Sequence, residues 1–78
     1  MPVRRFTVLL EYDPEAQLWV TFVPALDYIS TYGETREEAL DQTREMIAGY
    51  LEAAAQEGIP VPSESPAAEL VELEVPVA

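Results

Sequence analysis

TREEALDQTREMIAGYLEAAAQEG, residues 35–58, decides the fold, because this stretch predicts one long amphipathic helix. Thr35 is suited to N-cap the helix, and Glu38, three residues later, completes a T-x-x-E capping box. Gly58 supplies the left-handed stop, and Pro60 lies two residues beyond it. One stripe of mainly apolar side chains recurs at three- and four-residue spacing and is expected to pack on a sheet: Leu40, Thr43, Ile47, Tyr50, Leu51 and Ala54.

The rest of the chain predicts strands and connections. Four stretches are rich in β-branched and aromatic residues or alternate apolar and polar side chains: residues 3–12, 17–23, 27–32 and 69–77. The turn at residues 13–16 makes the first two an antiparallel hairpin, and we expect the last strand beside the first. The order β-β-β-α-β predicts a single α+β domain over residues 1–78. It has two layers, a mostly antiparallel sheet with one long helix on one face.

The second expected strand is apolar on both faces. Leu18, Val20 and Phe22 lie on one face, whereas Trp19 and Val23 lie on the other. One helix can cover only one face of the sheet, and a chain of 78 residues buries little apolar surface on its own. We therefore expect the face of Leu18, Val20 and Phe22 to be the interface of a homodimer or higher homo-oligomer. The alternative is that these side chains are simply exposed, as is common on small sheets.

The composition argues against several classes of partner. Fifteen Asp and Glu residues oppose four Arg residues, for a formal net charge of −11. Nucleic acid and anionic membranes both attract positively charged proteins, so we expect neither partner. A basic protein is the natural complement, although the charge also serves solubility.

Location and chemistry follow from what the sequence lacks. There is no histidine, which is the commonest general base and metal ligand, and no cysteine. We expect no catalytic residue, no cofactor and no metal site.

No apolar run approaches the roughly 18 residues needed to span a bilayer. The opening MPVRRF leads into a strand pattern and not into a signal peptide, so a cytoplasmic protein is expected.

Two acidic groups are the candidate partner-binding residues. Glu37, Asp41 and Glu45 follow one another at four-residue spacing along one side of the expected helix. Glu72 and Glu74 form the acidic face of the last expected strand. We expect these groups to steer a basic partner, the alternative being an ordinary solvated surface.

The order and spacing of several short motifs resemble the amino-terminal domain of the HicB family of bacterial antitoxins, which is a partly degraded ribonuclease-H-like fold. The resemblance covers nearly the whole chain, through RRFTVLLEYDPE, LWVTFVPALDY and YGETREEALDQTREMIAGYLEAAAQEGIPVPSES. The matching positions are Val23-Pro24, Tyr32-Gly33, Glu37-Glu38-Ala39 and the Gly-x-x-x-Pro of Gly58 to Pro62. Members often have Leu-Pro-Gly-Cys where this chain has Leu26-Asp27-Tyr28-Ile29, which affects the local loop.

The resemblance implies an antitoxin-like protein that binds and masks a small basic ribonuclease toxin of the HicA type. Full antitoxins of the family also carry a carboxy-terminal DNA-binding domain, whereas this sequence ends at Ala78, directly after the last expected strand. The resemblance therefore implies toxin binding and not operator binding.

Two other functions stay open. Ribonuclease-H-like enzymes hold divalent metal with several carboxylates, one of them at the centre of the first strand. That centre is Thr7-Val8-Leu9 here, but Glu11, Asp13 and Asp27 could meet near strand ends. A vestigial metal-dependent nuclease is therefore one alternative, and a solitary oligomeric scaffold without a toxin is the other.

Overall fold

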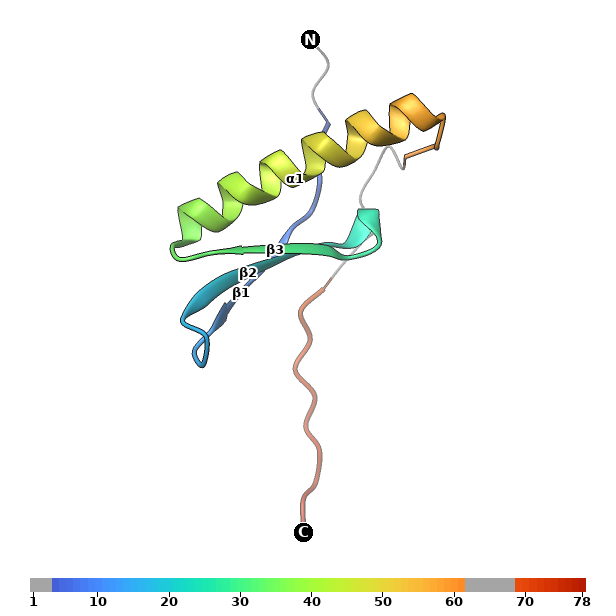
Figure 1. Cartoon of the computed structure of the whole chain (residues 1–78). Helices are drawn as coiled ribbons and strands as arrows, with labels where there is room; N and C mark the ends of the chain where they lie inside the picture. The colour runs from blue at the N-terminus through green and yellow to red at the C-terminus, as the bar shows by residue number, and fades with distance from the viewer. Residues whose placement is uncertain (1–3, 62–68) are drawn as a thin grey trace.

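The computed structural model describes residues 4–61 and 69–78. Three antiparallel strands form one sheet in the order β1-β2-β3, and one long helix crosses one face of it (Figure 1). The expected α+β class, a sheet with one long helix on one face, is confirmed. The elements are β1 (Leu9–Asp13), β2 (Leu18–Val23), the 3-10 helix η1 (Pro24–Leu26), β3 (Ile29–Gly33) and α1 (Arg36–Glu57).

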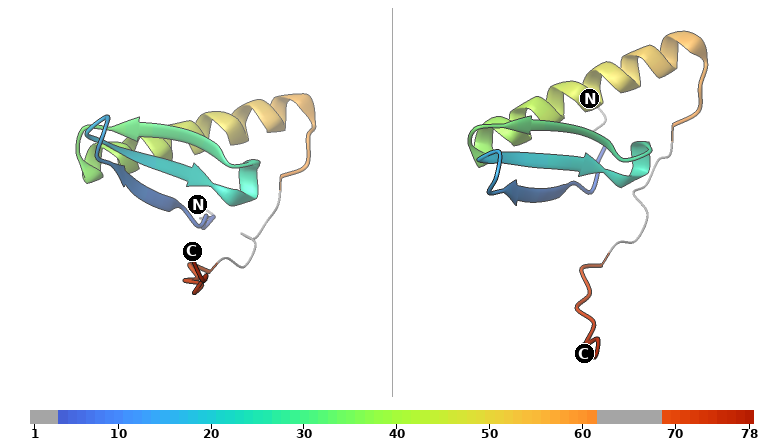
Figure 2. Two further views of the ribbon diagram at one scale, coloured as in Figure 1. Left: turned by 90° about the horizontal axis from the view of Figure 1, so that it is seen from below. Right: turned by 60° about the horizontal axis from the view of Figure 1, so that its bottom comes forward.

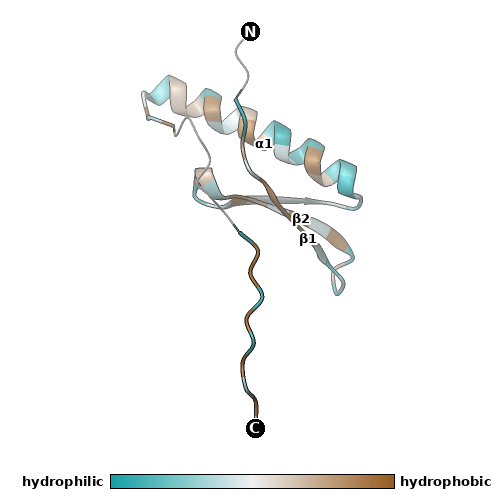
Figure 3. Cartoon of the chain, turned by 180° about the vertical axis from the view of Figure 1, so that it is seen from behind, coloured by the Kyte–Doolittle hydropathy of each residue, from teal (hydrophilic) through white to brown (hydrophobic). Residues whose placement is uncertain are grey.

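Strand β1 is shorter than the sequence predicted, because its partner ends early. The register pairs Leu9 with Phe22 and Asp13 with Leu18. Strand β2 stops at Val23, where Pro24, which has no N–H to donate, begins η1. Continuing this register would place Val8 opposite Val23, the last residue of β2. Residues 4–8 belong to no strand, and they leave β1 and cross one side of α1 (Figures 1 and 3).

Helix α1 has the ends that its sequence predicted. The Thr35 hydroxyl oxygen accepts a hydrogen bond from the Glu38 N–H at 3.0 Å. Gly58 has φ of 69° and donates its N–H toward the Ala54 and Ala55 carbonyls. Glu37 and Glu38 lie in the first turn, where the helix dipole favours negative charge.

Small residues bring the helix close to the sheet. A Cβ atom on Gly33 would lie 2.4 Å from the backbone nitrogen of Ala39, so only glycine allows this approach of β3 and α1. Further along, the Thr21 and Thr43 hydroxyl oxygens are 2.6 Å apart, and the Thr43 hydroxyl donates to the Ala39 carbonyl at 2.7 Å. Both threonines are buried. Buried apolar residues in the described part of the chain include Val23, Pro24, Leu26, Ala39 and Ala54.

The packed stripe of α1 is rotated from the expected one. Its buried residues are Ala39, Thr43 and Ala54, and Ala39 was not expected. Leu40, Ile47, Tyr50 and Leu51, which were expected to pack on the sheet, are half-buried. The contact at Gly33 draws the helix over β3 and β2, so the larger side chains of the stripe overhang the sheet beside β1.

The fourth strand expected at residues 69–77 is not formed. Residues 69–78, here called the tail, lead away from the sheet (Figures 1 and 2). Its apolar side chains are 65% to 93% exposed. An alternating pattern defines the two faces of an extended segment, but a strand also needs a hydrogen-bonding neighbour, and the pattern does not supply one.

Candidate functional site

The acidic residues predicted on the helix form one exposed face. Glu37, Asp41 and Glu45 are all exposed, on the side of α1 away from the buried Ala39, Thr43 and Ala54. Helical geometry adds two acids that the sequence analysis did not include. Glu52 lies two turns beyond Glu45, and Glu38 lies close to the same side. The five exposed carboxylates, here called the acidic face, are Glu37, Glu38, Asp41, Glu45 and Glu52.

Two arginines touch the acidic face without covering it. Arg44 donates to Asp41 at 2.8 Å, and Arg36 lies 3.9 Å from Glu37. Both pairs are largely exposed to solvent, where an ion pair contributes little. The face therefore keeps most of its negative charge for a partner.

The other predicted acidic pair lies elsewhere. Glu72 and Glu74 are exposed on the tail and belong to no strand. The structure therefore does not join them to the acidic face of α1, and the prediction that they form the polar side of a fourth strand is wrong in this chain.

The expected interface residues lie on the face of the sheet opposite α1. Leu18, Val20 and Phe22 alternate with Trp19, Thr21 and Val23, and Thr21 contacts the helix. All three are half-buried, and no other described element covers this open sheet face (Figure 2). Their role in an interface stays a prediction.

The three carboxylates of the nuclease alternative are not brought together. Asp13 closes β1 at the hairpin end, where its side chain accepts hydrogen bonds from the Glu15 and Ala16 N–H groups. Asp27 follows η1 at the opposite end of β2, in the left-handed conformation. Within residues 4–61 and 69–78, no group of three or more His, Cys, Asp or Glu residues could hold a metal ion. The described structure therefore does not bring together Glu11, Asp13 and Asp27, as the nuclease alternative would require.

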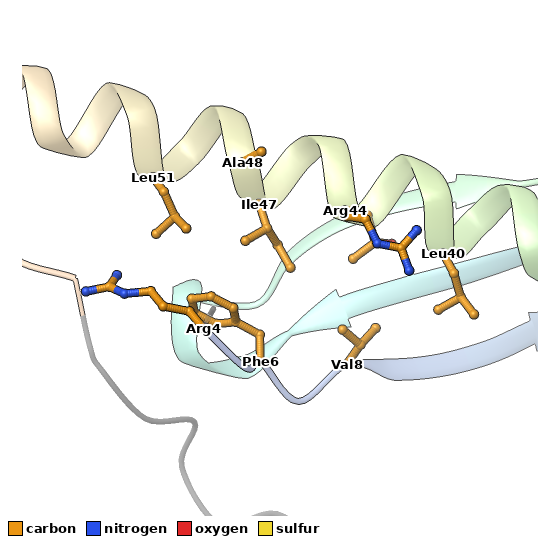
Figure 4. A pocket seen from close by; sticks show the side chains of 9 residues that line it. Arg4, Phe6, Val8, Leu40, Arg44, Ile47, Ala48 and Leu51 are labelled. Atoms are coloured by element: carbon orange, nitrogen blue, oxygen red, sulfur yellow. The ribbon is translucent and has the colours of Figure 1, made fainter. Parts of the chain in front are cut away.

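An apolar groove lies between α1 and residues 4–8, and the sequence analysis did not predict it. Its volume is about 540 Å³. Phe6 and Val8 face the overhanging Leu40, Ile47 and Leu51 of the helix (Figure 4). Arg4, Arg44, Thr43 and Ala48 complete the lining. The signal for the groove was the pair of small residues Gly33 and Ala39, which moves the helix contact away from the larger side chains.

No helix in the described ranges combines the length and the apolar character that crossing a membrane requires.

The fold and its surfaces define a small, acidic, two-layer α+β domain. No family model and no solved structure matches the chain. A UPF0150 protein from Thermotoga maritima is 36% identical over 52 residues, which are 67% of this chain and 69% of that protein. The chain belongs to the UPF0150 family.

Proposed function

We propose that this chain is an antitoxin-like protein that binds and masks a small basic ribonuclease toxin of the HicA type, without catalytic activity of its own. The observation that carries the proposal is the acidic face, which presents five carboxylates on the side of α1 away from the core. The resemblance to HicB antitoxins supports it, and membership of the UPF0150 family is compatible with it.

The proposed mechanism is steric occlusion guided by charge. A basic toxin would be drawn to the acidic face, since opposite charges raise the rate of encounter. The face does not hold the fold together, because the helix packs through Ala39, Thr43 and Ala54 on its other side. Its acids are therefore available for binding at little cost to stability.

Association kinetics test this mechanism. The candidate partner is any small basic protein encoded beside this gene, and binding is measured at about 50 and 300 mM salt. Neutralising Glu37, Asp41 and Glu45 to Gln, Asn and Gln should slow association about tenfold at low salt, where screening is weakest. The matched control neutralises three exposed acids outside the acidic face, Glu11, Glu15 and Glu57, and should stay within about twofold of wild type. Glu72→Gln/Glu74→Gln measures the tail separately.

Three outcomes would overturn the proposal. Association that neither salt nor the first triple variant alters would remove the electrostatic mechanism. A chain that ignores every basic protein encoded nearby would favour the solitary scaffold. Magnesium- or manganese-dependent cleavage of RNA by the pure protein, lost in Asp13→Asn, would revive the nuclease.

A further inference from the structure

The tail has one apolar row and one acidic row. In an extended segment successive side chains point to opposite faces, so Val71, Leu73, Val75 and Val77 share a face. Glu72 and Glu74 lie on the other. Leu73 is 80% exposed and Val77 is 90% exposed, which leaves the row without a covering surface in the described structure. In Figure 3 the tail is largely hydrophobic, broken by hydrophilic positions.

The groove has the complementary character. Apolar side chains from α1 and from residues 4–8 line it, and they are only half-buried. Residues 4–8 continue beyond the edge strand β1, which pairs with β2 alone in the described sheet. An extended segment seated in the groove would lie between residues 4–8 and the overhanging Ile47 and Leu51 of α1.

One arginine near the groove matches the acidic row of the tail. Two others, Arg4 and Arg44, line the groove itself, on the side that the apolar row would face. Arg5 is adjacent to Arg4 and so lies on the opposite side of the same extended segment. A tail whose apolar row enters the groove turns Glu72 and Glu74 to the side that carries Arg5.

We propose that the groove between α1 and residues 4–8 binds the tail of a second copy of this chain, so that two copies exchange tails in a two-fold dimer. Exchange between copies accounts for a tail that leads away from its own sheet (Figure 1). It also adds apolar side chains to a core in which the described part of the chain buries few. The proposal does not depend on toxin binding, and it uses a surface separate from the open sheet face.

The first experiment compares matched substitutions by analytical ultracentrifugation of the full chain. Leu73→Asn places a polar group in the apolar row, whereas Leu70→Asn makes the same change on the other row. Ala48→Gln adds bulk at an exposed helix position on the rim of the groove, whereas Ala53→Gln makes that change at an exposed position about 140° around the helix. Leu73→Asn and Ala48→Gln should each raise the dimer dissociation constant at least about 100-fold, because each dimer contains the change twice. The two controls should dimerise as wild type does.

The second experiment distinguishes exchange from a tail that folds onto its own chain. Each of the two defective variants retains one intact half: Leu73→Asn has a normal groove, and Ala48→Gln has a normal tail. Mixing them allows a heterodimer with one undamaged contact, which neither variant can form alone. Native mass spectrometry of the mixture should therefore show heterodimer at concentrations where each variant alone is monomeric. Circular dichroism of each monomer confirms that it is folded.

Three results would overturn the proposal. Wild type that stays monomeric at high concentration excludes the dimer. Defective variants that do not rescue each other exclude exchange. A dimer that survives Leu73→Asn and is lost in Phe22→Asn places the interface on the open sheet face instead.

Discussion

Gly33 is the residue at which sheet and helix come closest. The nearest atoms to a Cβ built there are backbone atoms of Glu38 and Ala39, which cannot move aside as a flexible side chain could. Gly49 gives the contrast, because it lies in the middle of α1 with nothing within 4 Å of the same added atom.

The two glycines should respond to alanine with opposite signs. Gly33→Ala should lower the free energy of unfolding by about 1–3 kcal/mol, since the backbone of α1 must shift. Gly49→Ala should raise it by about 0.5–1 kcal/mol, since alanine is the better helix former. Urea unfolding at one protein concentration measures both. A Gly33→Ala protein as stable as wild type would mean that the helix does not sit this close.

At this scale the sequence was informative where the chemistry is local. The caps at Thr35 and Gly58 were predicted because each contacts residues within four positions along the chain. The function of Gly33 was not predicted, because it depends on how a strand packs against a helix. The same unforeseen contact accounts for the burial of Ala39 and for the missed groove.

At the scale of elements, a pair of buried hydroxyl groups joins α1 to the middle strand. The Thr43 hydroxyl proton is used on the Ala39 carbonyl, so the Thr21 hydroxyl donates to the Thr43 oxygen. The Thr31 carbonyl, 3.4 Å from the Thr21 oxygen, offers a longer and weaker alternative.

A double-mutant cycle should detect the coupling between the Thr21 and Thr43 hydroxyl groups. Thr21→Val and Thr43→Val each keep the side-chain shape and should each lower the free energy of unfolding by about 1 kcal/mol. The loss in the double variant should be smaller than the sum of the two single losses by about 0.5–1 kcal/mol, because the hydrogen bond between the two hydroxyl groups can be lost only once. Denaturant unfolding of the four proteins gives the coupling. If the two changes in unfolding free energy are strictly additive, the hydrogen bond between the hydroxyl groups does not stabilise the contact between α1 and β2.

The elements also show which parts of the fold a sequence can predict. The helix satisfies its backbone internally and carries its own caps, so its bounds were correct. Strands depend on neighbours. Residues 3–8 were expected in the first strand, but the part of them that the structure describes lies outside it, because β2 ends at Val23. Residues 69–77 had the right alternation and no neighbour.

For the whole molecule, charge is the dominant property. A formal net charge of −11 on 78 residues makes the folded chain repel itself, and salt screens that repulsion. The melting temperature should therefore rise by about 4–8 °C between roughly 20 and 500 mM KCl, which corresponds to about 1 kcal/mol for a domain of this size.

Scanning calorimetry checks this, with the Glu37→Gln/Asp41→Asn/Glu45→Gln variant as the comparison. With three fewer negative charges on one helix face, the melting temperature at low salt should be higher, and its rise between low and high salt should be smaller. The Leu73→Asn variant repeats the measurement with the dimer weakened. A melting temperature that falls with salt would show that attractive ion pairs outweigh the excess of acid.

The composition of the tail also bears on aggregation. A row of valine and leucine side chains in an extended segment is the type of sequence that stacks into cross-β fibrils. Glu72 and Glu74, on the opposite face, place charge between the apolar residues along the chain, and Pro76 lacks a backbone donor near the end of the tail. We expect these three residues to act as gatekeepers, which would permit the one seated strand of the proposed dimer but oppose open-ended stacking.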